Sequence, residues 1–597
     1  MSAKSRLYDY CLMNIGRAVS VFLCLGLLLM LLSCGSQPQL RADDPHWYDA
    51  DKKDIAEPSS SNTSLAWDYA NRLVLDQAAQ TLDLERIVGR WFGSPKQSLN
   101  INSFDEVPNS SWFTNRHGLN RMTPVELAAG PNPSAGPNPS AGPNPSAGPD
   151  TSGAWVIFKP KVLGKTPGLW IEDKHGDRYI IKFDPPENPE MATSAAAMGS
   201  RFIYACGYNV PEETIVFWKP EILKIKEGLE FTDKDGVERS FTEADLNEML
   251  GRVRHDPDGS IRSLASKFLK NVKGPFSFSG RRDDDQNDWC PHEHRRELRG
   301  LYVISSLINH YDIKDQNTLD IYAEEGGRNF LEHYLIDFGS TFGSMGTRAK
   351  GPKVGYANIP DFRDMLVSFL TLGLKVWGWE KAEPYEYPSI GYFESEIFHP
   401  GKWDPIIPNP ACDNMTDRDA YWGAKIVMAF RDDDLRAIVG AGRLTNPEAE
   451  EYLIKTLIER RDKIGRHWFS KVNPLDYFEI YEENDALVFD FDDLSVMYGL
   501  EDASASIYKY DIKYRGKRII HTREVDDSRF ELSSGDLETL SGSFRHESNG
   551  NPANDHLYEI CIKTKRGDGG WSRPTVVWLW YFPDEDRYKA VGLEHCD

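Results

Sequence analysis

The sequence predicts a mixed α+β protein in which a strand-rich and then helical domain is followed by an all-β domain. Three observations support this. Short runs of β-branched and aromatic residues, broken by Gly and Asp turns, fill residues 155–218. Apolar residues recur at helical spacing over 293–309 and through most of 360–470. Beyond residue 480, short alternating strands separated by Asp and Gly turns return.

The composition limits which classes of function the protein can have. The chain has 597 residues, and 40% apolar and 12% aromatic content is enough to form large cores, which argues against wholesale disorder. Lys and Arg number 69 against 92 Asp and Glu, giving a net charge of −23. Because nucleic-acid phosphates require a basic face, we expect no nucleic-acid partner. Eight Cys in so long a chain are too few for a disulfide scaffold.

Residues 1–33 have the pattern of an export signal. An apolar, uncharged stretch over 18–32 follows Arg17, and its fifteen residues suit a signal peptide better than a membrane span of about 20 residues. It ends in Leu-Leu-Ser before Cys34, which resembles the bacterial lipobox. That resemblance implies cleavage before a lipidated Cys34 that holds the protein on a membrane of the bacterial cell envelope. Gly35 favours the outer membrane, and an uncleaved N-terminal anchor helix is the alternative.

Two segments separate this signal from the first strands. Residues 34–62 are polar and rich in Pro and Ser, which predicts a flexible tether. An extension over 63–149 follows, with a helix predicted over 62–90 from its apolar spacing. From Gly130 the hexapeptide GPNPSA occurs three times. Because Pro at this density prevents both helix and strand ladders, we expect an exposed surface loop there.

Two domains account for the rest of the chain. The first, over 150–475, has strands predicted at 155–158, 168–171, 178–183 and 210–218, and helices at 189–207, 293–309, 424–431 and 448–468. The second, over 480–597, has strands predicted at 507–514, 557–564, 574–581 and 588–592. This spacing of short strands predicts an all-β sandwich of the immunoglobulin or fibronectin type.

Two polar motifs follow the helix predicted over 293–309. They are His-Tyr-Asp-Ile-Lys-Asp-Gln-Asn at 310–317 and His-Tyr-Leu-Ile-Asp-Phe-Gly at 333–339. Asp312 can accept a hydroxyl proton, while Asn317 and Asp337 offer the oxygen ligands that Mg²⁺ prefers. The apolar residues before Asp337 place it at the end of a short strand.

These motifs resemble two signatures of the protein-kinase-like superfamily. The first matches the catalytic loop, His-Arg-Asp with an Asn five residues after the Asp, except that Tyr311 replaces the Arg. The second matches the Asp-Phe-Gly that binds magnesium. The resemblance implies a bilobal kinase-like domain with an antiparallel-sheet N-lobe and a helical C-lobe. It also implies that Asp312 orients an acceptor hydroxyl and that Asn317 and Asp337 hold Mg²⁺ for ATP.

The same resemblance extends to the predicted third strand. Tyr-Ile-Ile before Lys182 is similar to the Val-Ala-Ile-Lys strand of kinases, so Lys182 is expected on the α- and β-phosphates. Gly164 and Gly168 stand where a phosphate-covering loop belongs, with fewer glycines than usual. The next helix has no acid in its middle, so Glu190 at its start, or else Glu187, is the expected partner of Lys182. No Ala-Pro-Glu follows Asp-Phe-Gly, a departure that resembles the atypical kinases.

The sequence therefore predicts an envelope-anchored, kinase-like lipoprotein that transfers the γ-phosphoryl group of Mg·ATP to a hydroxyl acceptor. ATP is expected to be scarce outside the cytoplasm, which leaves two alternatives open. One is a catalytically inactive pseudokinase whose β-sandwich recognises a protein or a glycan. The other is a purely structural protein of the envelope.

Overall fold

The structure, a computed structural model, describes residues 46–62, 71–75, 89, 95–132, 148–161, 167–232, 236–357, 367–372, 374–545 and 556–596. Several predicted features lie outside these residues: the signal 1–33, Cys34, most of the helix predicted over 62–90, most of the GPNPSA repeat and Gly164. Within the described ranges, no helix combines the length and apolar character needed to cross a membrane. The described fold is mixed α+β, as predicted.

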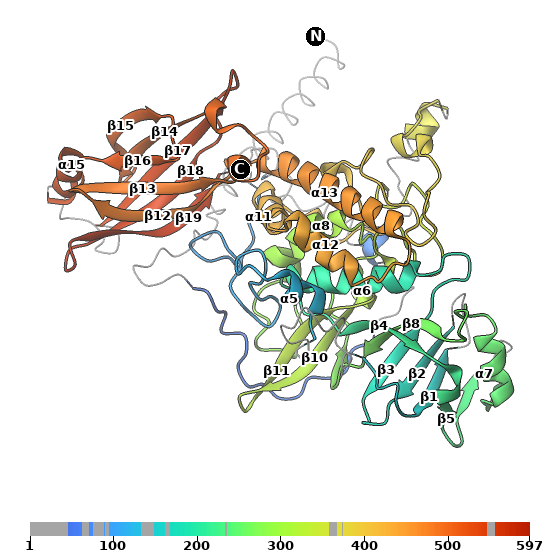
Figure 1. Ribbon diagram of the computed structural model, residues 1–597. Coiled ribbons are helices and arrows are strands. Elements are labelled where there is room, and N and C mark those ends of the chain that lie inside the picture. The colour runs from blue at the N-terminus through green and yellow to red at the C-terminus, as the bar shows by residue number, and fades with distance from the viewer. Residues whose placement is uncertain are drawn as a thin grey trace, which may run out of the picture.

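The first layer is a sheet whose described strands run in the order β4-β8-β3-β2-β1-β5 (Figure 1). All neighbours are antiparallel except β1 and β5. Alternating apolar residues, among them Trp155, Leu169 and Ile181, bury one face in a core. The four predicted strands are present, and the unpredicted β8 lies between β3 and β4. The bounds are β1 (Trp155–Lys161), β2 (Gly168–Glu172), β3 (Arg178–Lys182), β4 (Glu213–Trp218), β5 (Leu223–Ile225), β8 (Ile261–Lys267), with β6 (Glu230–Thr232), β7 (Glu238–Ser240) and α7 (Glu243–Leu250) beside them.

Helix α6 (Met191–Ala205) covers the other face of this sheet and corresponds to the helix predicted over 189–207. Small side chains let it approach its neighbours closely. Two of its alanines pack on Ile215 of β4. A Cβ at Gly199 would lie 3.0 Å from the Cβ of Phe338, tighter than ordinary packing allows. Helix α6 therefore sits between the sheet and the Asp-Phe-Gly motif.

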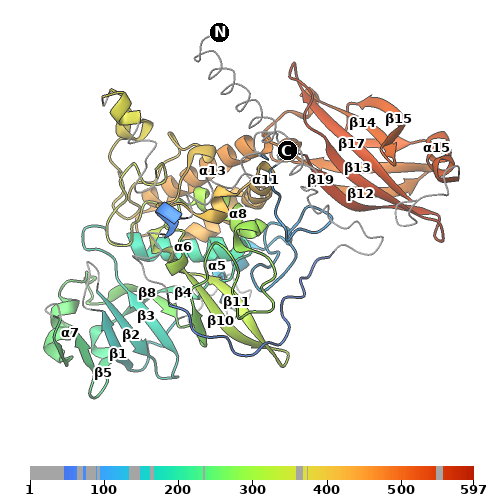
Figure 2. The same ribbon diagram turned by 180° about the vertical axis from the view of Figure 1, so that it is seen from behind.

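A group of helices lies beside the sheet (Figures 1 and 2). Helices α8 and α11 cross at close range, since a Cβ at Gly423 would lie 2.9 Å from the carbonyl oxygen of Gly300. The helices predicted over 293–309 and 448–468 are present as α8 and α13. The bounds are α5 (Pro124–Ala129), α8 (Arg296–Leu307), α11 (Asp417–Met428), α12 (Asp432–Gly440) and α13 (Pro447–Phe469). The shorter helical elements are η1 (Asn71–Leu75), η3 (Pro220–Ile222), η4 (His292–His294), η5 (Asp315–Asn317), η6 (Phe338–Ser340), η7 (Gly378–Lys381), η8 (Pro400–Lys402), α10 (Pro410–Asp413), α14 (Leu494–Met497) and η9 (Ala503–Ala505).

A small sheet, β11-β10-β9, positions the two polar motifs. Strands β10 (Thr318–Glu325) and β11 (Arg328–Leu335) form an antiparallel hairpin, and β9 (Val272–Gly274) pairs with β10. Thr318 and Leu335 face each other at the open end of the hairpin. The residues just outside that pair, at the end of the first motif and in the middle of the second, are therefore neighbours.

After α13 the described chain forms two antiparallel sheets, β12-β13-β16 and β15-β14-β17-β18-β19. They share one core, to which Phe489 and Leu532 contribute from the first sheet and Ile512 and Ile560 from the second. The predicted C-terminal strands are present in antiparallel sheets, and the described residues also include three helical elements that were not predicted, α14, η9 and α15. The immunoglobulin or fibronectin type stays a prediction. The bounds are β12 (Leu475–Glu483), β13 (Ala486–Asp493), β14 (Ser506–Tyr514), β15 (Lys517–Val525), β16 (Arg529–Leu532), α15 (Ser534–Arg545), β17 (Leu557–Arg566), β18 (Thr575–Phe582) and β19 (Arg587–His595).

Residues 46–62, here called the strap, are the described part of the flexible tether predicted over 34–62, and residues 34–45 lie outside the described residues. For the strap the prediction of a flexible tether is wrong. The strap lies along the β9–β10–β11 sheet. The amide of Ile55 donates to the carbonyl of Asn329 at 2.9 Å, and the amide of Ser61 donates to that of Lys273 at 2.7 Å. The polar side chains that suggest a solvated tether instead find hydrogen-bond partners on the body of the protein.

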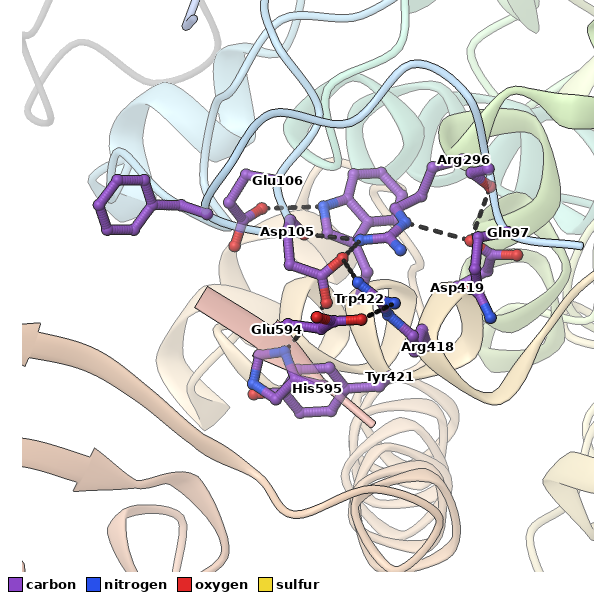
Figure 3. A network of polar contacts seen from close by, with 12 residues as sticks. Gln97, Asp105, Glu106, Arg296, Arg418, Asp419, Tyr421, Trp422, Glu594 and His595 are labelled. Carbon is purple, nitrogen blue, oxygen red and sulfur yellow. Dashed lines mark hydrogen bonds and ion pairs between the residues drawn. The ribbon is translucent and has the colours of Figure 1, made fainter. Parts of the chain in front are cut away.

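A buried network of charges joins the N-terminal extension, the helices and the last strand (Figure 3). Asp105 accepts hydrogen bonds from Arg296 of α8 at 2.6 Å, Arg418 of α11 at 2.9 Å and His595 of β19 at 3.0 Å. Arg296 also bonds Asp419 at 3.1 Å. Burial by itself raises the pKa of Asp105, but the three basic partners hold it well below its usual value.

We predict that Asp105→Asn costs about 3–5 kcal/mol of stability, because it removes the shared counter-charge of two buried arginines. Urea unfolding, followed by tryptophan fluorescence, measures this loss. The matched control is Glu451→Gln, which breaks an exposed ion pair with Arg436 and is expected to leave the stability nearly unchanged, because solvent screens the pair. Equal effects of the two substitutions would contradict the importance of the network.

Candidate functional site

The first motif forms a loop between α8 and β10 that is closed by its own side chains. The amide nitrogen Nδ2 of Asn317 donates to the backbone oxygen of Asp312 at 2.8 Å and to its carboxylate Oδ2 at 3.1 Å. Lys314 Nζ lies 2.8 Å from the other carboxylate oxygen, Oδ1. The Asp312 carboxylate is thus held between an amide and an ammonium group, at a fixed orientation.

The second motif lies directly beside this loop. The amide of Ile336 donates to the carbonyl of Asn317 at 3.0 Å, which joins the two motifs through their backbones. Asp337 follows with φ 64° and ψ 61°, a left-handed conformation that is uncommon for a non-Gly residue. This conformation turns the chain from β11 into η6 and projects the Asp337 carboxylate away from the strand.

Lys182, the last residue of β3, connects the six-stranded sheet to these motifs. Its Nζ lies 2.9 Å from Oδ1 of Asp337, although the two residues are 155 positions apart in the chain. The side chains of Lys182 and Asp337 are 35% and 49% exposed, so the pair is accessible to a ligand from solvent. The structure therefore brings together four predicted site residues from three segments: Lys182, Asp312, Asn317 and Asp337.

The charges of these groups shift one another's pKa values. The charge of Lys182 is the largest influence on Asp337 and, with the smaller contribution of Lys314, lowers the pKa of its carboxyl despite desolvation. Burial lowers the pKa of Lys182, but the carboxylates of Asp337 and Glu213 offset this and raise it above the ordinary value. The site thus holds an ionised carboxylate and an ammonium group at neutral pH.

Glu213, which the sequence analysis did not single out, is the second acid near Lys182. The strand register of β4, β8 and β3 places both side chains on the face covered by α6. Glu213 is 2% exposed, and neither carboxylate oxygen accepts a hydrogen bond of ordinary geometry from the described residues. Burial is the main cause that raises its pKa to about 7. In the sequence, the signal that could have identified Glu213 was an acid at the first position of a strand whose other residues are mostly apolar.

The prediction for Glu190 is wrong. This residue was expected to pair with Lys182, but its carboxylate accepts hydrogen bonds from the hydroxyl and the amide of Thr445, at 2.7 and 3.1 Å. Glu190 stands at the N-cap of α6 with a left-handed φ of 69°, which directs it to the loop before α13. Because the middle of α6 carries no acid, the acid near Lys182 comes from β4 instead.

The remaining predicted residues are placed as follows. Gly168 begins β2 directly opposite Lys182, and a Cβ there would lie 3.1 Å from the carbonyl oxygen of Ile181. His310 is buried against Phe338, and burial lowers its pKa to about 4, so it supports the loop as a neutral ring. Lys314 had no predicted role, although its place two residues after Asp312 was a usable signal.

The donor set suits a magnesium ion that is shared with a phosphate. Among the described residues, no group of three or more His, Cys, Asp or Glu forms a metal site of its own. Asn317 and Asp337 offer one amide and one carboxylate, and Mg²⁺ commonly takes one or two protein ligands and completes its shell with phosphate oxygens and water. The residues present therefore fit a metal–nucleotide complex better than a free metal ion.

Comparison with known proteins finds similarity to two kinases of known structure. No family model and no curated protein matches the chain. Among solved structures, the Helicobacter pylori proinflammatory kinase CtkA is 12% identical with a TM-score of 0.29, covering 53% of this chain and 97% of that one. The Golgi casein kinase is 9% identical with a TM-score of 0.25, covering 54% and 74%. It also matches in a structure with Mn/ADP bound, at 10% identity and a TM-score of 0.20. Similarities this low leave the functional argument to the side chains of the site.

We predict a pH-dependent stability that originates at Glu213. Because the pKa of Glu213 is about 7 in the folded protein and near 4.5 when unfolded, the folded state retains a proton that the unfolded state has lost. Stability should therefore fall as pH rises from about 5 to 7, and Glu213→Gln should reduce this fall. Thermal unfolding of the nucleotide-free protein across this range measures it. Glu227→Gln, at an exposed position, is the control and should leave the slope unchanged; an unchanged slope in Glu213→Gln would contradict the assignment.

Proposed function

We propose that the protein is an atypical kinase that transfers the γ-phosphoryl group of ATP to a hydroxyl acceptor. The observation that carries this proposal is the 2.9 Å contact between Lys182 and Asp337, beside the loop that holds Asp312 and Asn317. A cation, two metal-type ligands and a candidate base thus converge from separate segments. Phosphoryl transfer requires little covalent chemistry from the protein and depends on such positioning and charge stabilisation.

In this proposal Lys182 contacts the α- and β-phosphates. Its ammonium neutralises their charge, and buried Glu213 faces it from β4 in place of the acid that α6 lacks. Gly168, opposite Lys182 in the β2–β3 register, leaves space beside the phosphates because it has no side chain. The nucleotide displaces the contact between Lys182 and Asp337, which frees the Asp337 carboxylate.

Asn317 and Asp337 would hold the magnesium ion. When bound, Mg²⁺ supplies neutralisation of the charge on the transferring phosphoryl group. The half-exposed Asp337 carboxylate is oriented by its left-handed backbone, and Asn317 is fixed by its bonds to Asp312. Both ligands are therefore positioned before the nucleotide arrives.

Asp312 orients the acceptor hydroxyl and takes its proton. The new bond joins the hydroxyl oxygen to the γ-phosphorus, while the bond between that phosphorus and the β–γ bridging oxygen breaks and ADP leaves. Lys314, 2.8 Å from Asp312, places a positive charge next to the reacting groups. We further propose that the six-stranded sheet with α6 and the helices α8–α13 are the two lobes of a kinase-like domain, followed by an immunoglobulin- or fibronectin-like sandwich.

The proposal includes a location. The lipobox-like sequence before Cys34 supports a lipoprotein of the bacterial envelope, anchored through acyl chains on that residue, with an envelope protein or glycan as acceptor or partner. An ATP source outside the cytoplasm is required for catalysis there. Where it is missing, binding by an inactive kinase-like domain is the second candidate, and the assays below separate the two.

We predict that Asp312→Asn lowers the rate of phosphotransfer by about 100- to 10,000-fold, the usual contribution of a positioned base, while Mg·ATP binding remains. Transfer of labelled γ-phosphate to the protein itself or to envelope extract measures the rate, and thermal shift measures binding. Asp337→Asn should instead abolish the magnesium-dependent thermal shift. Wild-type binding without transfer would identify a pseudokinase, and the absence of both would refute the nucleotide site.

The anchor has a separate test. In cells that express the full chain, Cys34→Ala should move the protein from the membrane to the soluble fraction or leave an uncleaved precursor, because no thiol remains for acylation. Mass spectrometry of the N-terminal peptide identifies the lipid. Cys206→Ala, at a buried thiol, is the control. Unchanged membrane association and an unmodified Cys34 would rule out the lipoprotein assignment.

A further inference from the structure

One residue from the N-terminal extension reaches the loop that carries the proposed base. Arg72, in η1 (Asn71–Leu75), donates from Nη2 to both carboxylate oxygens of Asp315, at 2.9 and 2.7 Å. Its guanidinium also donates to the hydroxyls of Ser277 at 2.8 Å and Ser279 at 3.1 Å. Arg72 and Asp315 are 3% and 6% exposed. This is a buried charge pair with additional hydrogen bonds, an arrangement that fixes geometry strongly.

Asp315 occupies a central position in the loop. It lies three residues after Asp312 and two before Asn317, and it begins the single helical turn η5. The backbone carbonyl of Asp315 also accepts a hydrogen bond from the hydroxyl of Thr318 at 2.7 Å. A displacement of Asp315 therefore moves the base on one side and the metal ligand on the other.

The strap holds the segment that contacts Arg72. Ser61 bonds the carbonyls of Lys273 and Pro275, which lie four and two positions before Ser277, the first of the serines that Arg72 contacts. A Cβ at Gly274, where φ is +101°, would lie 2.0 Å from the carbonyl oxygen of Ser61, so the strap is seated on a position that only Gly permits. Two parts of the N-terminal region thus converge on one side of the loop.

We propose that Arg72 is a positioning residue for phosphoryl transfer. Through Asp315 it orders the loop 310–317, so that Asp312 and Asn317 adopt their reactive arrangement only when the N-terminal region is docked. The inference rests on the proposed kinase function. It makes the described residues 46–62 and 71–75 intramolecular activating elements of the site, distinct from a passive connection to the anchor.

The test compares Arg72→Ala with Arg116→Ala in the full chain. Arg116 belongs to the same extension and is partly buried, but it bonds the carbonyls of Tyr204 and Tyr208, and no described contact joins it to the loop. We expect Arg72→Ala to lower kcat by about 100-fold, the cost of a misplacement of about 1 Å. The KM for ATP should change less than about 3-fold, since Lys182 is untouched. Arg116→Ala should keep kcat within about 3-fold.

Two further measurements separate positioning from general stability. Hydrogen exchange should become faster at amides 310–317 in Arg72→Ala and not in Arg116→Ala, at equal fractions of folded protein. Methylguanidinium should restore part of the kcat of Arg72→Ala, whose lost group it replaces, but not that of Asp315→Ala.

The outcomes are distinguishable from those of the proposed function. A wild-type protein without phosphotransfer refutes the kinase proposal, and hydrogen exchange then still decides whether Arg72 orders the loop. An unchanged exchange rate in the loop of Arg72→Ala overturns the inference. So does a kcat loss that is equal in Arg72→Ala and Arg116→Ala and follows only their thermal stability.

Discussion

The buried Asp105 carboxylate is the constraint on which the rest of the structure depends. It lies in the N-terminal extension and accepts hydrogen bonds from α8, α11 and the last strand β19 (Figure 3). Three elements that are far apart in the sequence thus share one counter-charge. Because buried cations are costly without a partner, loss of this carboxylate would destabilise the contacts that join the extension, the helices and the C-terminal sheets. The position of α8 follows, and with it the start of the loop that begins after that helix.

The candidate site depends on a second, weaker contact, between Lys182 of the sheet and Asp337 of the hairpin. Both side chains are more than a third exposed, so solvent screens the pair and its contribution to stability is small. Its importance is chemical, because it places an ammonium group against a metal-type ligand at an accessible position. The rigid parts behind it are well packed: α6 contacts Phe338 through Gly199, and buried Glu213 faces Lys182 from β4.

Local motifs were a good guide to part of this site. Asp312, Asn317 and Asp337 could be predicted because each lies in a short segment whose residue types and spacing already express its chemistry. Lys182 could be predicted from the resemblance of its strand to the Val-Ala-Ile-Lys strand of kinases. Glu213 and Arg72 could not, since an acid in a strand and an arginine in a polar extension have many structural uses. Only strand register and the path of the extension bring them to the site. The expected role of Glu190 failed for the same reason, because the orientation of its backbone at the start of α6 is a tertiary property.

By itself, the sequence determined the mixed α+β class, the main helices and strands, and the identity of the two polar motifs, because hydrophobic periodicity and turn residues act over a few neighbouring positions. Tertiary structure decided which acid faces the lysine, where the polar N-terminal residues lie, and which cation braces the loop. These outcomes depend on contacts between residues that are distant along the chain, from 31 positions for Lys182 and Glu213 to 243 for Arg72 and Asp315. Such contacts are hydrogen bonds or charges that are buried together, and no local pattern records which groups will meet.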